Sequence, residues 1–171
     1  MLNSKAYIKL KKYNEKHRLT NKISSINRII TGKDTKKEAV IQDVGIPIQN
    51  CVKFLQFFNS EIKIKPVWIC PMKIYNNKHN FPLFEIDSKI LYIDFGFWDS
   101  VETKKENGYY NKMIENTVEK LKGKKSLYSD SYFQKDDFFR IYNGKIYEKL
   151  KRKYDSGGVF LDLYQKTVLR K

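Results

Sequence analysis

The sequence predicts an α+β fold, a ferredoxin-like βαββαβ antiparallel sheet with helices on one face, flanked by N-terminal and C-terminal helical segments. Three observations predict it. Strand-like alternation marks several segments, above all "ILYIDFGFW". Apolar residues recur at helical spacing in two others. These segments follow one another in the split βαβ order, which leaves one face of the sheet free to meet a ligand or a second domain.

We expect three parts along the chain of 171 residues. Residues 1–37 form an N-terminal helical segment and a polar linker, with Gly32 ending the helix. Residues 38–132 form the ferredoxin-like domain, and residues 133–171 form a C-terminal helical extension.

Four segments of the central part have strand character. The first, 39–47, alternates and ends on a proline, and the second, 65–75, is β-branched and aromatic and lies between prolines. The third, 90–98, is the clearest. One face carries apolar residues only, and the other carries Tyr92, Asp94 and Gly96. The fourth is 125–132. In this order the first and third strands are central.

Helices are expected between and after these strands. Ile48, Val52, Leu55 and Phe58 share one face of a helix over 48–60. A second helix follows the third strand, with Gly123 as its C-cap residue. After the last strand, Asp136 and Asp137 lie in the first turn of a short helix, where negative charge is favoured. A further helix covers about 144–153.

The charge balance is strongly basic, with 34 Lys+Arg against 19 Asp+Glu and a net charge of +15. Such an excess can indicate a nucleic-acid or anionic-membrane partner. The abundance of Lys, Asn, Ile and Tyr together is also what an A/T-rich genome would supply. The lysines are scattered along the chain rather than focused in a stripe, which favours the second interpretation.

Several classes of protein are disfavoured. Cys51 and Cys70 have no CxxC partner, so we expect core thiols and no metal. Lysines interrupt the N-terminus where a signal peptide would be apolar, and no apolar run approaches ~18 residues. We therefore expect an intracellular protein, cytoplasmic or peripheral to a membrane, without a signal peptide or a transmembrane segment.

Motifs for phosphate and RNA recognition are missing. Gly157 and Gly158 are the only glycine pair, and neither nucleotide-binding glycine motif occurs. Ferredoxin-like RNA binders stack bases on aromatics of the central strands, but the first strand carries none and the RNP motif is absent. Nucleic acid is therefore not the expected partner.

Carboxylates on the predicted strands are the residues that stand out. Asp43, Asp94 and Asp130 fall on three different strands, although strands are depleted in Asp. On the last strand, Tyr128, Asp130 and Tyr132 alternate and would share one side. Two phenols and a carboxylate can hold or deliver a proton. Solvent exposure on an open sheet face is the alternative, since surface tyrosines are common.

Three longer stretches of the sequence resemble a known protein family, which the patterns described above do not identify. The segments "VIQDVGIPIQNCVKFLQFFNSEIKIKPVWICPM", "LYIDFGFW" and "SLYSDSYFQKDDFFRIYNGKIYEKLKRKYDSGGVFLDLYQK" resemble the C-terminal half of the Delta(24)-sterol reductase (Diminuto-like) group. This group consists of FAD-linked oxidoreductases of the vanillyl-alcohol oxidase superfamily. The resemblance extends over nearly the whole chain, with its motifs in order.

The resemblance implies a cap, or substrate, domain whose open sheet face covers flavin and substrate. Family members pass a hydride from NADPH through FAD to a sterol side-chain double bond, and an acid protonates the other carbon. The resemblance starts at the level of the cap, so we expect the domain that binds the FAD pyrophosphate to be missing from this chain. We therefore expect a separate FAD-binding chain as partner, a truncated remnant, or retention for another use.

Site residues follow from the matched motifs. Tyr128, in "LYSDSY", is implied to face substrate or flavin as the proton donor, with Asp130 and Tyr132 in support. We expect Tyr92, Asp94 and Trp98 to line a substrate pocket suited to a sterol-like, apolar molecule. Phe95 and Phe97 could line the same pocket, but the alternation along the strand favours their packing on the helices. The alternative function is a basic, non-enzymatic module that binds nucleic acid or an anionic membrane.

Overall fold

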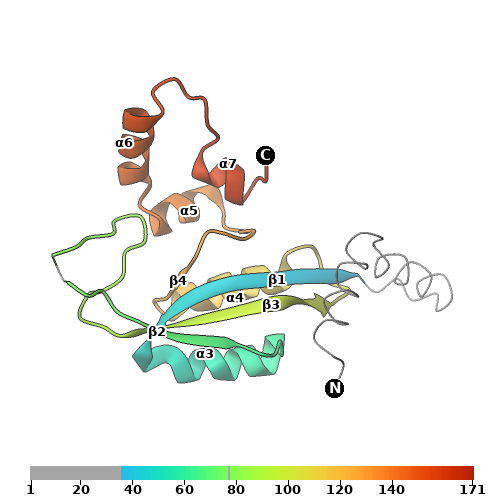
Figure 1. Ribbon diagram of the computed structural model, residues 1–171. Helices are drawn as coiled ribbons and strands as arrows, with labels where there is room; N and C mark the ends of the chain where they lie inside the picture. The colour runs from blue at the N-terminus through green and yellow to red at the C-terminus, as the bar shows by residue number, and fades with distance from the viewer. Residues whose placement is uncertain (1–35, 77) are drawn as a thin grey trace, which may run out of the picture. The chain divides into compact units, whose positions relative to one another are not determined.

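A computed structural model describes residues 36–76 and 78–171 of the chain (Figure 1). Lys37–Lys171 forms one compact unit. The predicted N-terminal helix lies outside the described residues. The division into three parts proposed from the sequence therefore stays a prediction, and the following description concerns the unit from Lys37 onward.

The described unit is built on one four-stranded antiparallel sheet in the order β2-β3-β1-β4, which confirms the α+β class. The two long strands are central and pair over their full lengths, from Lys37 opposite Glu102 to Pro47 opposite Tyr92. This order is that of the predicted split βαβ fold. The strands are β1 (Lys37–Pro47), β2 (Trp68–Met72), β3 (Tyr92–Glu102) and β4 (Lys124–Lys125).

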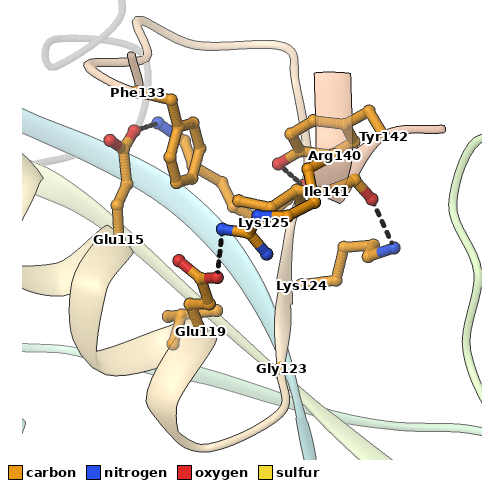
Figure 2. A pocket seen from close by; sticks show the side chains of 10 residues that line it. Glu115, Glu119, Gly123, Lys124, Lys125, Phe133, Arg140, Ile141 and Tyr142 are labelled. Carbon is orange, nitrogen blue, oxygen red and sulfur yellow. Dashed lines mark hydrogen bonds and ion pairs between the residues drawn. The ribbon is translucent and has the colours of Figure 1, made fainter. Parts of the chain in front are cut away.

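The predicted fourth strand over 125–132 is wrong, because β4 ends at Lys125. The Lys125 side chain turns inward, where its ammonium lies 2.7 Å from Glu115 (Figure 2). The same ammonium donates a hydrogen bond to the Asp130 carbonyl at 2.5 Å. The chain therefore curls around this buried cation instead of continuing an extended ladder. Only Ser126 prolongs the pairing, with its N–H donating to the Asp43 carbonyl.

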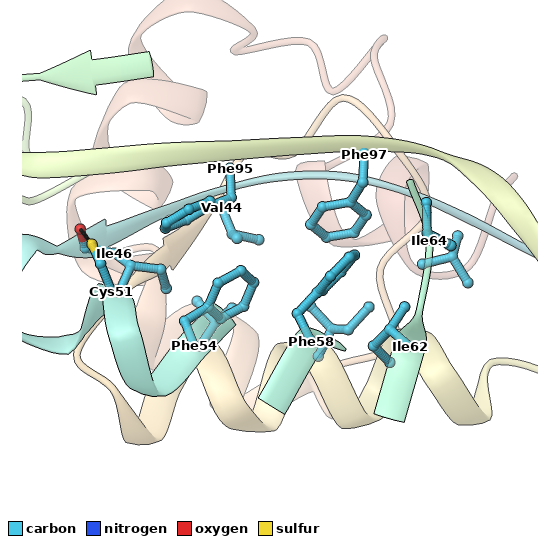
Figure 3. Packing of buried hydrophobic residues seen from close by; sticks show 12 residues of the cluster. Val44, Ile46, Cys51, Phe54, Phe58, Ile62, Ile64, Phe95 and Phe97 are labelled. Carbon is cyan, nitrogen blue, oxygen red and sulfur yellow. Dashed lines mark hydrogen bonds between the residues drawn. The ribbon is translucent and has the colours of Figure 1, made fainter. Parts of the chain in front are cut away.

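Two helical segments cover one face of the sheet, as the sequence predicts. They are the continuous run η1 (Ile48–Asn50), α3 (Cys51–Phe57) and η2 (Phe58–Ile62), and the helix α4 (Tyr109–Lys120). Phe54 and Phe58 meet Phe95 and Phe97 with ring centroids 5.0 and 4.5 Å apart (Figure 3). The expectation that Phe95 and Phe97 pack on the helices is confirmed, and both are buried.

Buried polar side chains link β1 to α4 at the edge of this core. Asn111 of α4 accepts a hydrogen bond from Gln42 at 2.8 Å and donates to Glu38 at 2.7 Å. All three side chains are buried, and hydrogen bonding offsets the cost of removing them from water. The network fixes the start of α4 against β1.

The C-terminal extension forms a second, smaller aromatic cluster. Its helices are α5 (Lys135–Ile141), α6 (Gly144–Tyr154) and α7 (Leu163–Thr167). Phe138 contacts both Tyr142 and Tyr164, and Phe139 contacts Tyr147. The Tyr142 hydroxyl donates to the Lys125 carbonyl at 2.8 Å, which joins the cluster to β4 (Figure 2). These aromatic side chains therefore serve packing.

Candidate functional site on the open sheet face

The face of the sheet opposite α3 and α4 carries the candidate site. Antiparallel register places Asp43 opposite Gly96 on one side of β3 and Trp68 opposite Gly96 on the other. Asp94 lies two residues from Gly96 along β3, opposite Gly45 and Cys70. Because alternate residues of a strand share a face, these side chains gather on one surface.

Two carboxylates lie on this surface in half-buried positions. Burial raises the pKa of Asp43, and a hydrogen bond with Tyr128 partly offsets the increase. Burial also raises the pKa of Asp94, and the negative charge of Asp43 raises it further. Both groups therefore hold a proton to higher pH than an ordinary aspartate. The Asp43 Oδ1 atom is buried and has no hydrogen-bond partner.

An indole and a phenol stand beside the carboxylates. The Trp98 Nε1–H donates to the Tyr128 hydroxyl over 3.2 Å. Burial raises the pKa of Tyr128, and the charge of Asp43 adds to the effect. Both rings still expose about half of their surface, 53% for Trp98 and 54% for Tyr128. They offer an accessible aromatic wall next to groups that can carry a proton.

Gly96 makes this arrangement sterically feasible, and the sequence analysis gave it no role. A Cβ atom at this position would lie 2.5 Å from Asp43 Oδ1 and 2.7 Å from the Trp98 ring. The absence of a side chain therefore lets the carboxylate and the indole approach the same point of the sheet. A glycine inside a strand is itself a signal of such close approach.

Replacing Gly96 with alanine is expected to displace Trp98 and Asp43 and to destabilise the fold by about 1–3 kcal/mol. The Trp98 fluorescence should shift in a Trp68→Phe background, and urea unfolding gives the stability. Gly157→Ala is the matched control, because a Cβ there has its nearest neighbour at 3.6 Å. Unchanged emission and stability in Gly96→Ala would show that the close approach is not real.

The structure brings together only some of the residues predicted from the sequence. Asp94, Trp98 and Tyr128 lie on the open face with Asp43. Tyr92 borders this face, but its ring is buried, and its hydroxyl accepts the N–H of Asp87 over 3.2 Å.

Asp130 and Tyr132 lie apart from this group. Asp130 pairs with Arg170 at 3.3 Å, and the Arg170 guanidinium lies 4.8 Å from the centre of the Tyr132 ring. The alternation that would align Tyr128, Asp130 and Tyr132 requires an extended strand, which the curl after β4 removes. Asp43 takes the place beside Tyr128 that the sequence assigned to Asp130. The position of Asp43 in the middle of a predicted strand marked it as unusual. The sequence did not show that Asp43 would lie beside Tyr128, because that contact depends on how the strands pair.

Two other kinds of feature, a metal site and a membrane-spanning helix, are absent from the described residues. Within 36–76 and 78–171, no group of three or more His, Cys, Asp or Glu side chains is placed to share a metal ion. In the same residues, no helix combines the length and the apolar character that a membrane span requires.

Comparison with known proteins finds similarity to Delta(24)-sterol reductases from several organisms. The chain is 27% identical to the Delta(24)-sterol reductases of Rattus norvegicus and Homo sapiens over 128 residues, which are 74% of this chain and 25% of those proteins. It is 23% identical to the Delta(24)-sterol reductase of Arabidopsis thaliana over 145 residues, 75% of this chain and 26% of that protein.

These similarities support a relation to the Delta(24)-sterol reductases. The chain spans about a quarter of the length of the curated relatives it matches. No protein-family model and no solved structure matches the chain.

Proposed function

We propose that this chain is the cap, or substrate-side, portion of an FAD-linked oxidoreductase that reduces a carbon–carbon double bond in a sterol-like molecule. The similarity to Delta(24)-sterol reductases supports the reaction class. The observation that carries the proposal is the cluster of Tyr128, Asp43, Asp94 and Trp98 on the open face of the sheet. The sterol-like substrate, and NADPH as the source of reducing equivalents, rest on the resemblance alone.

The chemistry of the cluster suits the second half of such a reduction. Saturating a double bond requires a hydride at one carbon and a proton at the other, and FAD supplies the hydride when bound. We assign the Tyr128 phenol the role of proton donor. Asp43 forms a hydrogen bond with it, and the raised pKa values of Asp43 and Asp94 make these two carboxyl groups a reserve of protons close by.

The open face fits one part of FAD better than the rest. The exposed rings of Trp68, Trp98 and Tyr128 suit a flat aromatic or apolar group. The sequence has no glycine-rich loop that would cradle a pyrophosphate. We therefore assign the pyrophosphate and the adenine to a separate FAD-binding domain or chain, and the substrate side of the flavin to this chain.

Co-expression of the chain with an FAD-binding protein encoded beside it tests the pairing. We expect the two to co-purify with a flavin absorption spectrum. Failure of every neighbouring FAD-domain protein to co-purify would contradict the pairing, and a flavin-bound complex that never reduces a double bond would contradict the reaction.

Tyr128→Phe is expected to lower the rate of double-bond reduction in that complex by about 10²–10⁴-fold, because the donor hydroxyl is lost. Flavin content should be unchanged. Tyr75→Phe is the control, since Tyr75 is fully exposed on a loop. If the reduction rate of Tyr128→Phe equals that of the parent, Tyr128 is not the donor.

A further inference from the structure

A patch of apolar side chains projects from the C-terminal extension and has no part in the proposed reaction. We call Val159, Phe160 and Leu161 the apolar tip. They follow one another in the loop that joins α6 to α7, and Figure 1 shows this loop on the side of the helical segment away from the sheet. Val159 is 80% exposed and Phe160 is 73% exposed. Three successive exposed apolar residues are unusual where no partner covers them.

The backbone of the tip is held in place by one carboxylate. Asp155 accepts the N–H of Val159 at 2.8 Å and the N–H of Phe160 at 3.1 Å. The Lys151 ammonium contacts the same carboxylate and also donates to the Phe160 carbonyl at 2.5 Å. The hydrogen bonds from Lys151, Val159 and Phe160 hold the pKa of Asp155 below its usual range, so the carboxylate stays charged.

The far side of the loop is held as well. Asp162 forms a capping box with Gln165 at the start of α7, and the N–H of Leu163 donates to the Tyr147 hydroxyl at 2.8 Å. The tip is therefore fixed at both ends. Its apolar side chains point into solvent because a polar network holds the backbone, so they are already exposed for a partner.

The charge around the tip is basic. Lys149, Arg152 and Lys153 are exposed on α6, and Lys153 lies 5.1 Å from the ring centre of Tyr154, which is 74% exposed. Glu148 is the exposed carboxylate on this helix, and it lies 3.5 Å from Arg152. The negative charge of Asp155 is already matched by Lys151.

We propose that the apolar tip inserts into the interface of an anionic lipid membrane, while the exposed basic residues of α6 contact the headgroups. Shallow insertion of aromatic and aliphatic side chains beside Lys and Arg is the chemistry of peripheral membrane binding. A nucleic acid could use the basic residues and stack bases on Phe160 and Tyr154, but Val159 and Leu161 offer no ring for stacking. The two aliphatic side chains of the tip therefore favour the acyl chains of a lipid. The inference is independent of the proposed reductase role.

Co-sedimentation of the full chain with lipid vesicles tests the proposal. We expect binding to vesicles of equal parts phosphatidylcholine and phosphatidylserine, and much weaker binding to phosphatidylcholine alone. Phe160→Ser/Leu161→Ser should weaken binding to the anionic vesicles at least about tenfold, because two apolar side chains no longer leave water. Phe81→Ser is the matched control, since Phe81 is exposed on a different loop.

A second pair of variants separates a defined surface from adsorption by net charge. Lys149→Glu/Arg152→Glu/Lys153→Glu should abolish binding to the anionic vesicles. Lys53→Glu/Lys104→Glu/Lys120→Glu makes the same change of net charge at exposed positions elsewhere and should retain most of it. Circular dichroism of each variant verifies folding, which these exposed substitutions should leave intact.

The proposal is overturned by any of three results. The parent chain could fail to bind anionic vesicles, the tip variant could bind as the parent does, or the two charge variants could lose binding equally. Retained vesicle binding by the tip variant, together with salt-sensitive binding of single-stranded RNA, would instead indicate a nucleic-acid surface.

Discussion

Replacing Lys125 with methionine is expected to lower the free energy of unfolding by about 3–5 kcal/mol, because it leaves a buried carboxylate without its cation. The exposed side-chain fractions are 0% for Lys125 and 2% for Glu115. The Lys125 ammonium also satisfies the Asp130 carbonyl, so the curl after β4 loses its central contact. Urea unfolding followed by circular dichroism measures the loss.

Two comparisons assign the loss to the buried charge. Adding Glu115→Gln to Lys125→Met removes the unpaired charge and keeps an acceptor for the Tyr132 N–H, so at least about 1 kcal/mol should return. Lys112→Met breaks an exposed pair with Glu106 and should change stability by less than about 0.5 kcal/mol. Equal losses for Lys112→Met and Lys125→Met would contradict the argument.

The stability of Lys125→Met should also depend on pH in a defined direction. Burial raises the pKa of Glu115, and Lys125 opposes this effect in the parent chain. Without Lys125, the folded state holds the proton more tightly than the unfolded state, so stability is lost as pH rises above the unfolded pKa. The variant should therefore lose less relative to the parent at about pH 5 than at about pH 8. A constant difference would contradict this account.

Phe58→Ala is expected to destabilise the fold by about 3–5 kcal/mol, because it opens a cavity in the centre of the core. Phe58 is fully buried and meets Phe97 at 4.5 Å and Phe54 at 5.8 Å between ring centroids. The core lies between a sheet and helices that are tied at several points, so collapse around the missing ring is limited. Thermal and urea unfolding measure the effect.

A substitution on the same helical run provides the control. Val52 is 66% exposed on α3, and Val52→Ala should change stability by less than about 0.5 kcal/mol. If Phe58→Ala cost no more than Val52→Ala, the packing of η2 against β3 shown in Figure 3 would be wrong.

Much of the fold could be predicted because local periodicity is strong. The alternation in "ILYIDFGFW" placed Phe95 and Phe97 on the helix side, and the structure confirms it. The helical spacing over 48–60 correctly predicted the helical run from η1 to η2. The predicted face was wrong in part, because Ile48 and Val52 are exposed while Phe54 and Phe58 form the buried side. Apolar residues stand on both sides of this short run, so spacing alone did not record which side faces the core.

The fourth strand shows where local pattern was insufficient. The segment after Lys125 alternates in its sequence, but a buried lysine paired with Glu115, ten residues earlier, decides its path. The ion pair between Lys125 and Glu115 is strong because both side chains are buried. Their burial arises only when the core assembles, so the local sequence pattern does not show it. The polar cluster near the start of β1 also depends on segments distant in sequence, since Asn111 contacts Glu38 across 73 positions of the chain.

The sequence by itself determined the side of β3 that faces the helices, because that side follows from periodicity within one element. It also predicted the α+β class and the strand order, because the strands and helices follow one another in the split βαβ order. It also singled out Asp94, Trp98 and Tyr128. Only the tertiary structure decided that Asp43 stands beside Tyr128 while Asp130 pairs with Arg170. The physical reason is that strand register and a buried ion pair set which side chains meet, and both arise between segments distant in sequence.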